Sequence, residues 1–310
     1  MLKTWLTDRF DLQVPVVSAP MAGVSGGALA GAVSAAGGLG LIGWAGPDVD
    51  QLRREIATAA APGRAWGIGF LAWTLSPGDE QLIDIALEAG ASMVCISYGD
   101  YEQYVDRITA AGAVAATQVG TLADVRRAID AGVDVIVARG GEGGGHGRDS
   151  VATLPLLQAV LDATDLPVLA AGGIATARGL AAVLAAGAAG GWVGTAFLAT
   201  NESSYGDGHK DAVIGAELDS SVHTTVFDIG RGSPWPEEFG GRALRNSYSD
   251  TWLHRDEELR ANPVRSEEPA VWAGQVAGLV TSRRAAAEVV AELAGAERLL
   301  AEVCGSVTRG

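Results

Sequence analysis

The sequence predicts an α/β fold: a (β/α)8 TIM barrel with a smaller, mostly helical excursion over the C-terminal mouth of the barrel. Eight short, continuously apolar segments alternate with helical segments over roughly the first 200 residues. Strands that are apolar on both faces are typical of a buried parallel sheet. Several helices end in the same sequence pattern, Ala-Gly followed by an apolar run, which indicates a βα repeat. It is seen in EAGASMV, AAGAVAA, DAGVDVI and AAGAAGGWV. An open doubly wound sheet is the competing fold, and it would use the first glycine-rich turn instead.

The expected strands follow from these apolar runs and the glycine or proline residues that bound them. They are Val16–Ala19, Leu39–Gly43, Trp66–Leu71, Met93–Ser97, Val114–Gln118, Val133–Ala138, Pro167–Ala171 and Gly191–Gly194.

The expected helices are indicated by caps, amphipathic spacing and terminal glycines. An Ala-rich run after Ser25 is followed by helices at Asp48–Ala61, Pro77–Gly90, Asp100–Gly112, Thr121–Gly132, Leu154–Thr164 and Thr176–Gly187. Thr121 is placed to cap its helix.

The chain is expected to divide into three parts. Residues 1–200 form the barrel, 201–269 a mostly helical lid on the substrate side, and 270–310 helices that pack back on the barrel. The middle part lacks the βα repeat, whereas helical periodicity returns at Val271–Val280 and Arg283–Cys304.

Composition narrows the functional classes. The net charge of −15 argues against binding to nucleic acid or to an anionic membrane, because both require basic patches. The uncharged stretch 12–47 contains nine glycines and three prolines, so a buried core explains it better than a membrane helix. Cys95 and Cys304 form no disulfide framework and no metal-ligand spacing. With no signal peptide visible, we expect a cytoplasmic protein, monomeric or homodimeric, without a metal.

The most informative stretch is VARGGEGGGHGRD at Val137–Asp149, which follows the sixth strand. Five glycines between Gly140 and Gly145 allow the backbone to approach a planar ligand closely. His146 directly after them suggests proton chemistry beside that ligand. A flexible loop is the alternative interpretation of the string alone.

The loops after the seventh and eighth strands read AAGGIAT and VGTAF. In barrels of this kind they are the usual pair that binds a phosphate, because free N–H groups meet there near helix starts. With no Lys-Ser/Thr loop and no paired metal carboxylates, a phosphate-anchored cofactor is indicated. Flavin mononucleotide (FMN) fits a phosphate site facing a flat, glycine-lined loop, and a phosphorylated sugar substrate is the competitor.

Together these residues resemble the nitronate monooxygenase family (formerly 2-nitropropane dioxygenases), flavin barrels related to flavin-dependent enoyl-acyl-carrier-protein reductases. The resemblance lies in PVVSAPMAGVS at Pro15–Ser25, GGEGGGHGR at Gly140–Arg148 and the long segment Leu166–Ser203, with a weaker match at Val271–Val280.

The resemblance implies which residues contact FMN and which one acts as the base. The FMN contacts are Ala19, Pro20, Met21, Gln118, Gly144, Gly145, Gly172, Gly173, Gly194 and Thr195, and His146 matches the catalytic base. Arg139 is a further candidate, either as a cation beside reduced flavin or for an anionic substrate. Its alternative is a salt bridge to Glu142.

The implied activity is oxidation of alkyl nitronates, or of nitroalkanes, by O2 to a carbonyl compound and nitrite. A neutral imidazole would take the acidic α-proton of the nitroalkane. The alternative is an NAD(P)H-dependent flavin reductase acting on a quinone or an enoyl thioester. A barrel without flavin that binds a phosphorylated substrate, and a non-catalytic FMN-binding protein, are further alternatives. Trp44, Trp73, Trp235 and Trp252 are candidate walls of a substrate cavity, although packing is their default role.

Overall fold

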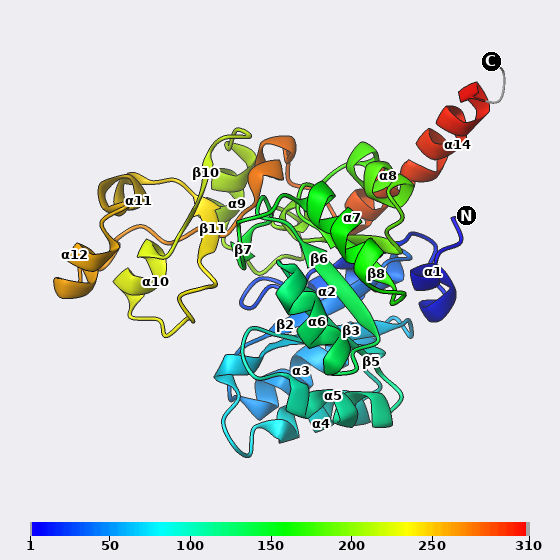
Figure 1. The fold of residues 1–310 in the computed structure, drawn as a ribbon, viewed down its shortest axis with the longest axis horizontal. Helices are drawn as coiled ribbons and strands as arrows, with labels where there is room; N and C mark the ends of the chain where they lie inside the picture. Colours follow the sequence, from blue (N-terminus) through cyan, green and yellow to red (C-terminus); the bar gives the residue numbers. More distant parts are fainter. Residues whose placement is uncertain (1, 308–310) are drawn as a thin grey trace.

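A computed structural model describes residues 2–307, and within them eight parallel strands close into a barrel surrounded by helices (Figure 1). The predicted fold class is confirmed. Each strand pairs with its neighbour along the chain, and the last pairs with the first through Val17 and Trp192. The barrel strands are β1 (Val16–Ser18), β2 (Leu39–Trp44), β3 (Trp66–Leu71), β4 (Met93–Ser97), β5 (Val114–Val119), β6 (Val135–Arg139), β8 (Val168–Ala171) and β9 (Gly190–Val193).

Three of the helices between the strands begin where the side chain of a capping residue accepts a hydrogen bond from a free N–H group. Asp48, Thr121 and Thr176 each accept a hydrogen bond from the backbone three residues later. The predicted capping role of Thr121 is thereby confirmed. The elements are α2 (Gly27–Ala35), α3 (Val49–Ala60), the 3-10 helix η1 (Ala72–Thr74), α4 (Glu80–Glu88), α5 (Glu102–Ala110), α6 (Leu122–Asp130), α7 (Thr153–Ala163), α8 (Ala177–Ala185) and the 3-10 helix η2 (Thr195–Phe197).

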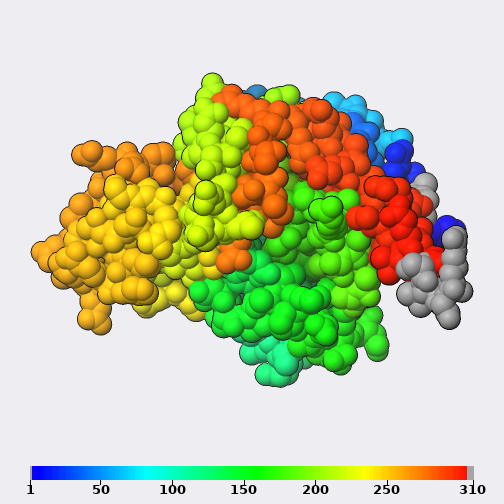
Figure 2. Space-filling model, turned by 90° about the horizontal axis from the view of Figure 1, so that it is seen from above, coloured from blue at the N-terminus to red at the C-terminus, as the bar shows by residue number. Residues whose placement is uncertain are grey.

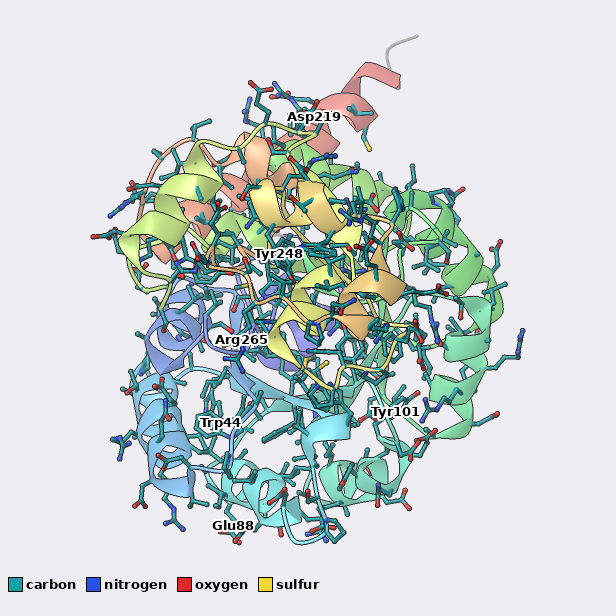
Figure 3. The ribbon with its side chains drawn as sticks, turned by 90° about the vertical axis from the view of Figure 1, so that its left-hand side faces the viewer. Trp44, Glu88, Tyr101, Asp219, Tyr248 and Arg265 are labelled. Atoms are coloured by element: carbon teal, nitrogen blue, oxygen red, sulfur yellow. The ribbon has the colours of Figure 1, made fainter. Side chains whose placement is uncertain are left out.

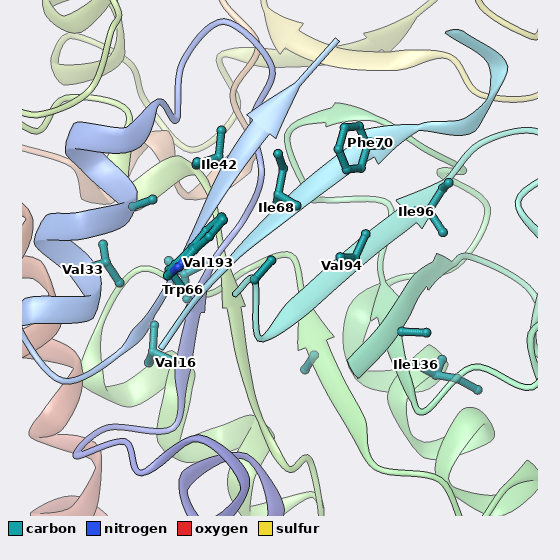
Figure 4. Packing of buried hydrophobic residues seen from close by; sticks show 14 of the residues in the cluster. Val16, Val33, Ile42, Trp66, Ile68, Phe70, Val94, Ile96, Ile136 and Val193 are labelled. Carbon is teal, nitrogen blue, oxygen red and sulfur yellow. The ribbon is translucent and has the colours of Figure 1, made fainter. Parts of the chain in front are cut away.

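Alternate side chains along each strand supply two different cores. Outward residues such as Ile42, Ile68 and Ile96 share one core cluster with residues of the surrounding helices. Figure 4 shows these three side chains on their strands. Inward residues such as Leu41 and Met93 fill the barrel, together with residues of the short helix α1 (Trp5–Phe10). The continuous apolar runs of the sequence therefore reflect burial of both strand faces.

The excursion lies beside the barrel mouth, in yellow and orange in Figures 1 and 2, and in front of the ring of barrel helices in Figure 3. Besides its helices it carries an antiparallel sheet that the sequence did not predict, ordered β10-β11-β7. The third strand, β7 (Gly145–His146), belongs to the glycine-rich loop of the barrel. The other elements are α9 (Asp207–Ile214), β10 (Ser221–Thr224), α10 (Val226–Arg231), β11 (Gly241–Leu244), α11 (Ser247–Trp252) and α12 (Asp256–Ala261).

The C-terminal part departs from the expected helices at one place. Only the 3-10 helix η3 (Gln275–Leu279) forms within Val271–Val280, so the prediction of a longer helix there was wrong. The backbone at Gly274 is pressed against the glycine-rich loop, where an added Cβ would lie 2.6 Å from the Glu142 carbonyl oxygen, and the chain reaches it in extended form.

Two helices follow, α13 (Ala286–Ala294) and α14 (Ala296–Val307), with Gly295 between them. Both pack on α8, and the distal end of α14 extends away from the barrel (Figure 1). The three-part domain division stays a prediction, and its residues 1 and 308–310 lie outside the described residues. None of the helices between residues 2 and 307 is long and apolar enough to cross a membrane.

Candidate active site

A cavity of about 550 Å³ opens at the carboxyl ends of the barrel strands. This volume is in the range of pockets that hold a drug-sized ligand. All the predicted site residues line it, namely Ala19, Pro20, Met21, Gln118, Arg139, Gly144, Gly145, His146, Gly172, Gly173, Gly194 and Thr195. The structure therefore brings every one of them to a single place, while their contacts with a cofactor stay a prediction.

One end of the cavity has the features of an anion cradle. Gly172 and Gly173 adopt φ values of +102° and +73°, which side chains rarely allow. Among the hydrogen bonds of residues 2–307, the N–H groups of Gly173 and Gly194 have no protein acceptor. The Thr195 hydroxyl accepts a bond from Gly274 N–H at 2.9 Å, so its own proton is free to be donated. These donors suit a phosphate.

The segment Ala19–Met21 crosses the mouth of the barrel because neighbouring strands carry glycines there. A Cβ at Gly43 would lie 2.3 Å from the Met21 carbonyl carbon, and one at Gly69 would lie 2.4 Å from Pro20 Cγ. The segment is held by Ser25, whose hydroxyl accepts a bond from Met21 N–H at 2.6 Å. It thus forms a fixed backbone wall for a ligand.

Arg139, at the end of β6, is hydrogen-bonded to the backbone of the glycine-rich loop. Its guanidinium donates to the carbonyl oxygens of Gly143, Gly144, Gly145 and Arg148 at 2.7, 3.2, 2.9 and 2.8 Å. These bonds go to backbone carbonyls and not to a salt bridge with the Glu142 carboxylate. The side chain is buried, and burial lowers the pKa of Arg139. Arg139 also borders the cavity. Its role as a cation beside reduced flavin, or for an anionic substrate, stays a prediction.

Glu142 has a separate task at the base of the loop. Its carboxylate accepts bonds from Thr153 N–H, at the first residue of α7, at 3.0 and 3.2 Å. A carboxylate at a helix N-terminus is stabilised by the helix dipole. Glu142 thereby ties the loop to the next barrel helix.

His146 lines the cavity and has one ring nitrogen bonded and the other free. Its Nε2 lies 2.8 Å from Asp228 Oδ2. A carboxylate that is ionised can only accept, so Nε2 carries the proton and Nδ1 keeps a lone pair. Nδ1 has no hydrogen-bond partner among the described residues. Burial is the largest effect on the pKa of His146 and lowers it, while Asp228 acts in the opposite direction.

Asp228, on α10, is a site residue that the sequence reasoning missed. Its side chain is only 6% exposed, and its second oxygen accepts a bond from Arg231 Nη2 at 2.8 Å. Arg231 also lies over the Trp272 ring, with the guanidinium carbon 5.3 Å from its centre, and borders the cavity. One signal was available: TVFDIGR places a carboxylate in an apolar helical stretch, which is unusual without a partner.

Two tryptophan rings contact the His146 imidazole. Trp235 is stacked at 3.7 Å with planes 3° apart, and Trp272 is tilted at 4.5 Å. Trp44, labelled in Figure 3, and Trp73 also border the cavity, as predicted for possible wall residues. Trp252 does not; it packs beside α10 and α12 within the excursion.

Tyr98 fixes the backbone of His146. Its hydroxyl donates to the His146 carbonyl oxygen at 2.9 Å, and its ring packs edge-on against Trp235 and Phe239. Burial raises the pKa of Tyr98 to about 12, so the phenol stays protonated and able to donate at neutral pH. Nothing in the sequence pattern singled out this tyrosine.

The remaining histidines lie outside the cavity. His209 is half-buried and stacks on Tyr205, His223 donates to the Gly147 carbonyl oxygen at 2.9 Å, and His254 is exposed. His223 supports the loop from β10, in keeping with a structural role.

Comparisons with known proteins agree with the barrel fold. The chain is 37% identical over 231 residues to the (3aS,4S,5R,7aS)-5-hydroxy-7a-methyl-1-oxo-octahydro-1H-indene-4-carboxyl-CoA dehydrogenase of Mycobacterium tuberculosis. That match covers 73% of this chain and 64% of the relative, so the chain spans less than two thirds of its length.

Solved structures match over a larger share of the chain. FabK from Thermotoga maritima superposes with a TM-score of 0.84 at 27% identity, covering 99% of this chain and 100% of that one. Nitroalkane oxidase from Streptomyces ansochromogenes gives 0.78 at 30% identity, covering 95% and 99%. The family model described as nitronate monooxygenase matches residues 3–64 and 70–295. The chain therefore belongs to the nitronate monooxygenase family, whose members are oxidoreductases.

Proposed function

We propose that this protein is an FMN-dependent oxidase that converts nitroalkanes and their nitronates, with O2, into a carbonyl compound and nitrite. The observation that carries the proposal is the unpaired Nδ1 of His146, a residue that lines the same cavity as the anion cradle. The likeness to a nitroalkane oxidase supports the substrate class.

The residues present fit FMN. Gly173 and Gly194 offer free N–H groups, and Thr195 offers a hydroxyl, to a phosphate. A Cβ added at Gly145 would meet nothing within 4 Å, so the backbone there is open to a flat ring. When bound, FMN would supply the two-electron oxidant that O2 regenerates.

The protein's own part in the reaction is binding, desolvation and proton removal. Nδ1 of His146 takes the α-proton of a neutral nitroalkane and leaves the nitronate, the form that is readily oxidised. Trp235 and Trp272 keep water from the imidazole, which favours its neutral, basic form. Arg231, half-exposed at the cavity, provides positive charge for the anion so formed.

The test compares a nitroalkane with its preformed nitronate. The purified protein should show a flavin spectrum, and nitroethane should yield nitrite with consumption of O2. His146→Asn should keep the flavin and lose about 10²–10⁴-fold in kcat/KM for nitroethane, because general-base catalysis contributes that much. His254→Asn, the same exchange at an exposed histidine, is the matched control. A colourless protein that FMN does not reconstitute would contradict the proposal.

A second candidate is an NAD(P)H-dependent flavin reductase acting on a quinone or an enoyl thioester. The relative named as a carboxyl-CoA dehydrogenase supports a thioester substrate. Anaerobic mixing distinguishes the two functions: rapid bleaching of the flavin by NADH or NADPH favours the reductase, whereas bleaching by the nitronate favours the oxidase.

A further inference from the structure

We propose that Asp228 is a positioning residue that fixes His146 in the tautomer with the proton on Nε2, and that Arg231 enforces the orientation of the Asp228 carboxylate. This inference rests on the proposed function, since it concerns the nitrogen that acts as the base. Asp228 belongs to the excursion and lies 82 residues along the chain from His146.

The imidazole has little freedom other than the position of its proton. Trp235 and Trp272 confine the ring, and Tyr98 bonds to the carbonyl of the same residue. The backbone is further fixed because β7 pairs with β11, His146 lying opposite Gly241. A neutral imidazole so held can carry its proton on either nitrogen, and only the partner of Nε2 decides which.

Arg231 fixes which oxygen of the Asp228 carboxylate faces His146. Its guanidinium can only donate, and it donates to Oδ1 while His146 faces Oδ2. In Asp228→Asn, the amide oxygen would have to face Arg231, which leaves the NH2 group facing Nε2. That NH2 group also donates, so the imidazole proton would move to Nδ1. The lone pair on Nδ1 would be lost.

The charged groups around the imidazole come from two elements. Asp228 and Arg231 lie on α10, and Arg139 lies at the end of β6; the neutral phenol of Tyr98 follows β4. Asp228 raises the pKa of His146, whereas both arginines lower it. Loss of the carboxylate charge therefore lowers this pKa further, and the acidic limb of the pH profile should move to lower pH.

The first experiment measures Asp228→Asn in the flavin-loaded protein. With nitroethane, kcat/KM should fall about 10²–10⁴-fold, the contribution of general-base catalysis; the same exchange in a serine-protease triad lowers kcat about 10⁴-fold. With preformed ethyl nitronate, which needs no proton removal, the loss should stay below about tenfold. Asp84→Asn, which breaks an Asp–Arg pair on the outside of the barrel, is the matched control. Equal losses with both substrates would overturn the proposal in favour of a purely structural role.

The second experiment adds Arg231→Met to Asp228→Asn. Without the guanidinium, the amide can turn its oxygen towards Nε2 and restore the original tautomer. The double variant should then be more active on nitroethane than Asp228→Asn by about tenfold, after correction for Arg231→Met alone. Losses that simply add, or that more than add, once the effect of Arg231→Met alone has been subtracted, would overturn the role assigned to Arg231.

A spectroscopic readout separates this proposal from the proposed function. Nitrogen-15 NMR of His146 should show protonated Nε2 in the wild type and protonated Nδ1 in Asp228→Asn. This result can be obtained whatever substrate the protein uses, so a failure to oxidise nitroethane would leave it intact. An unchanged tautomer in Asp228→Asn would overturn the positioning role even if nitrite were released by the wild type.

Discussion

Replacement of Arg139 by methionine should loosen the active-site loop while leaving the barrel folded. The guanidinium makes four hydrogen bonds to carbonyl oxygens of the loop, and the side chain is only 4% exposed. Each bond to a charged donor contributes about 1.5–3 kcal/mol. The sum of these four contributions overstates the loss of stability, because the substitution also removes the cost of burying a cation, which is several kcal/mol.

We therefore expect Arg139→Met to lower the free energy of unfolding by about 2–4 kcal/mol. At about 2 °C per kcal/mol, the lower figure for large domains, Tm should fall by about 4–8 °C. FMN affinity should fall with it, since Gly144 and Gly145 lie on the loop and border the cavity. Calorimetry and flavin titration measure the two effects.

The same exchange at an exposed arginine provides the control. Arg107 donates to both oxygens of Asp84 at 2.7 Å, but its side chain is 44% exposed. Surface pairs of this kind contribute at most about 1 kcal/mol. If Arg139→Met melted within about 1 °C of Arg107→Met and bound FMN equally well, the reasoning about the loop would be refuted.

Three further predictions concern the cavity. The acidic limb of kcat/KM for nitroethane should have an apparent pKa below 6.5, the ordinary value of histidine, because burial lowers that of His146; a pH-rate profile measures it. Trp235→Leu uncovers one ring face, so the limb should move to higher pH, and a limb that stayed in place would count against desolvation as the cause. Gly43→Ala places a Cβ 2.3 Å from the Met21 carbonyl carbon, and a flavin titration should show weakened binding with the circular dichroism spectrum retained; unweakened binding would speak against the backbone wall.

The sequence contained most of the barrel and much of the site, for physical reasons. Strands buried on both faces are continuously apolar, so the expected segments match the observed strands to within two residues, for example Trp66–Leu71 and Met93–Ser97. The glycines of the loops could be recognised because close backbone approach and positive φ leave few other choices, as at Gly172.

The partners of the imidazole could not be predicted in the same way. Asp228 meets His146 only because the excursion folds back over the mouth, and the strand next to α10 reads SVHT, without apolar alternation. The hydrogen bonds of Arg139 could not be predicted from the sequence either, because their acceptors are backbone carbonyls, which every residue possesses. Arginine and glutamate three positions apart suggested a salt bridge, whereas the folded loop directs the two side chains to different partners.

The pairing of β7 with β11 limits how this protein could be re-engineered. His146 belongs to the barrel by sequence, but its strand partner, its carboxylate and its stacked ring all come from the excursion. A chimera that exchanged residues 201–269 with those of a relative would replace part of the cavity wall, including Trp235, and the surroundings of His146 together. Graded point changes within the excursion are therefore the safer way to alter the cavity while keeping the contacts of His146.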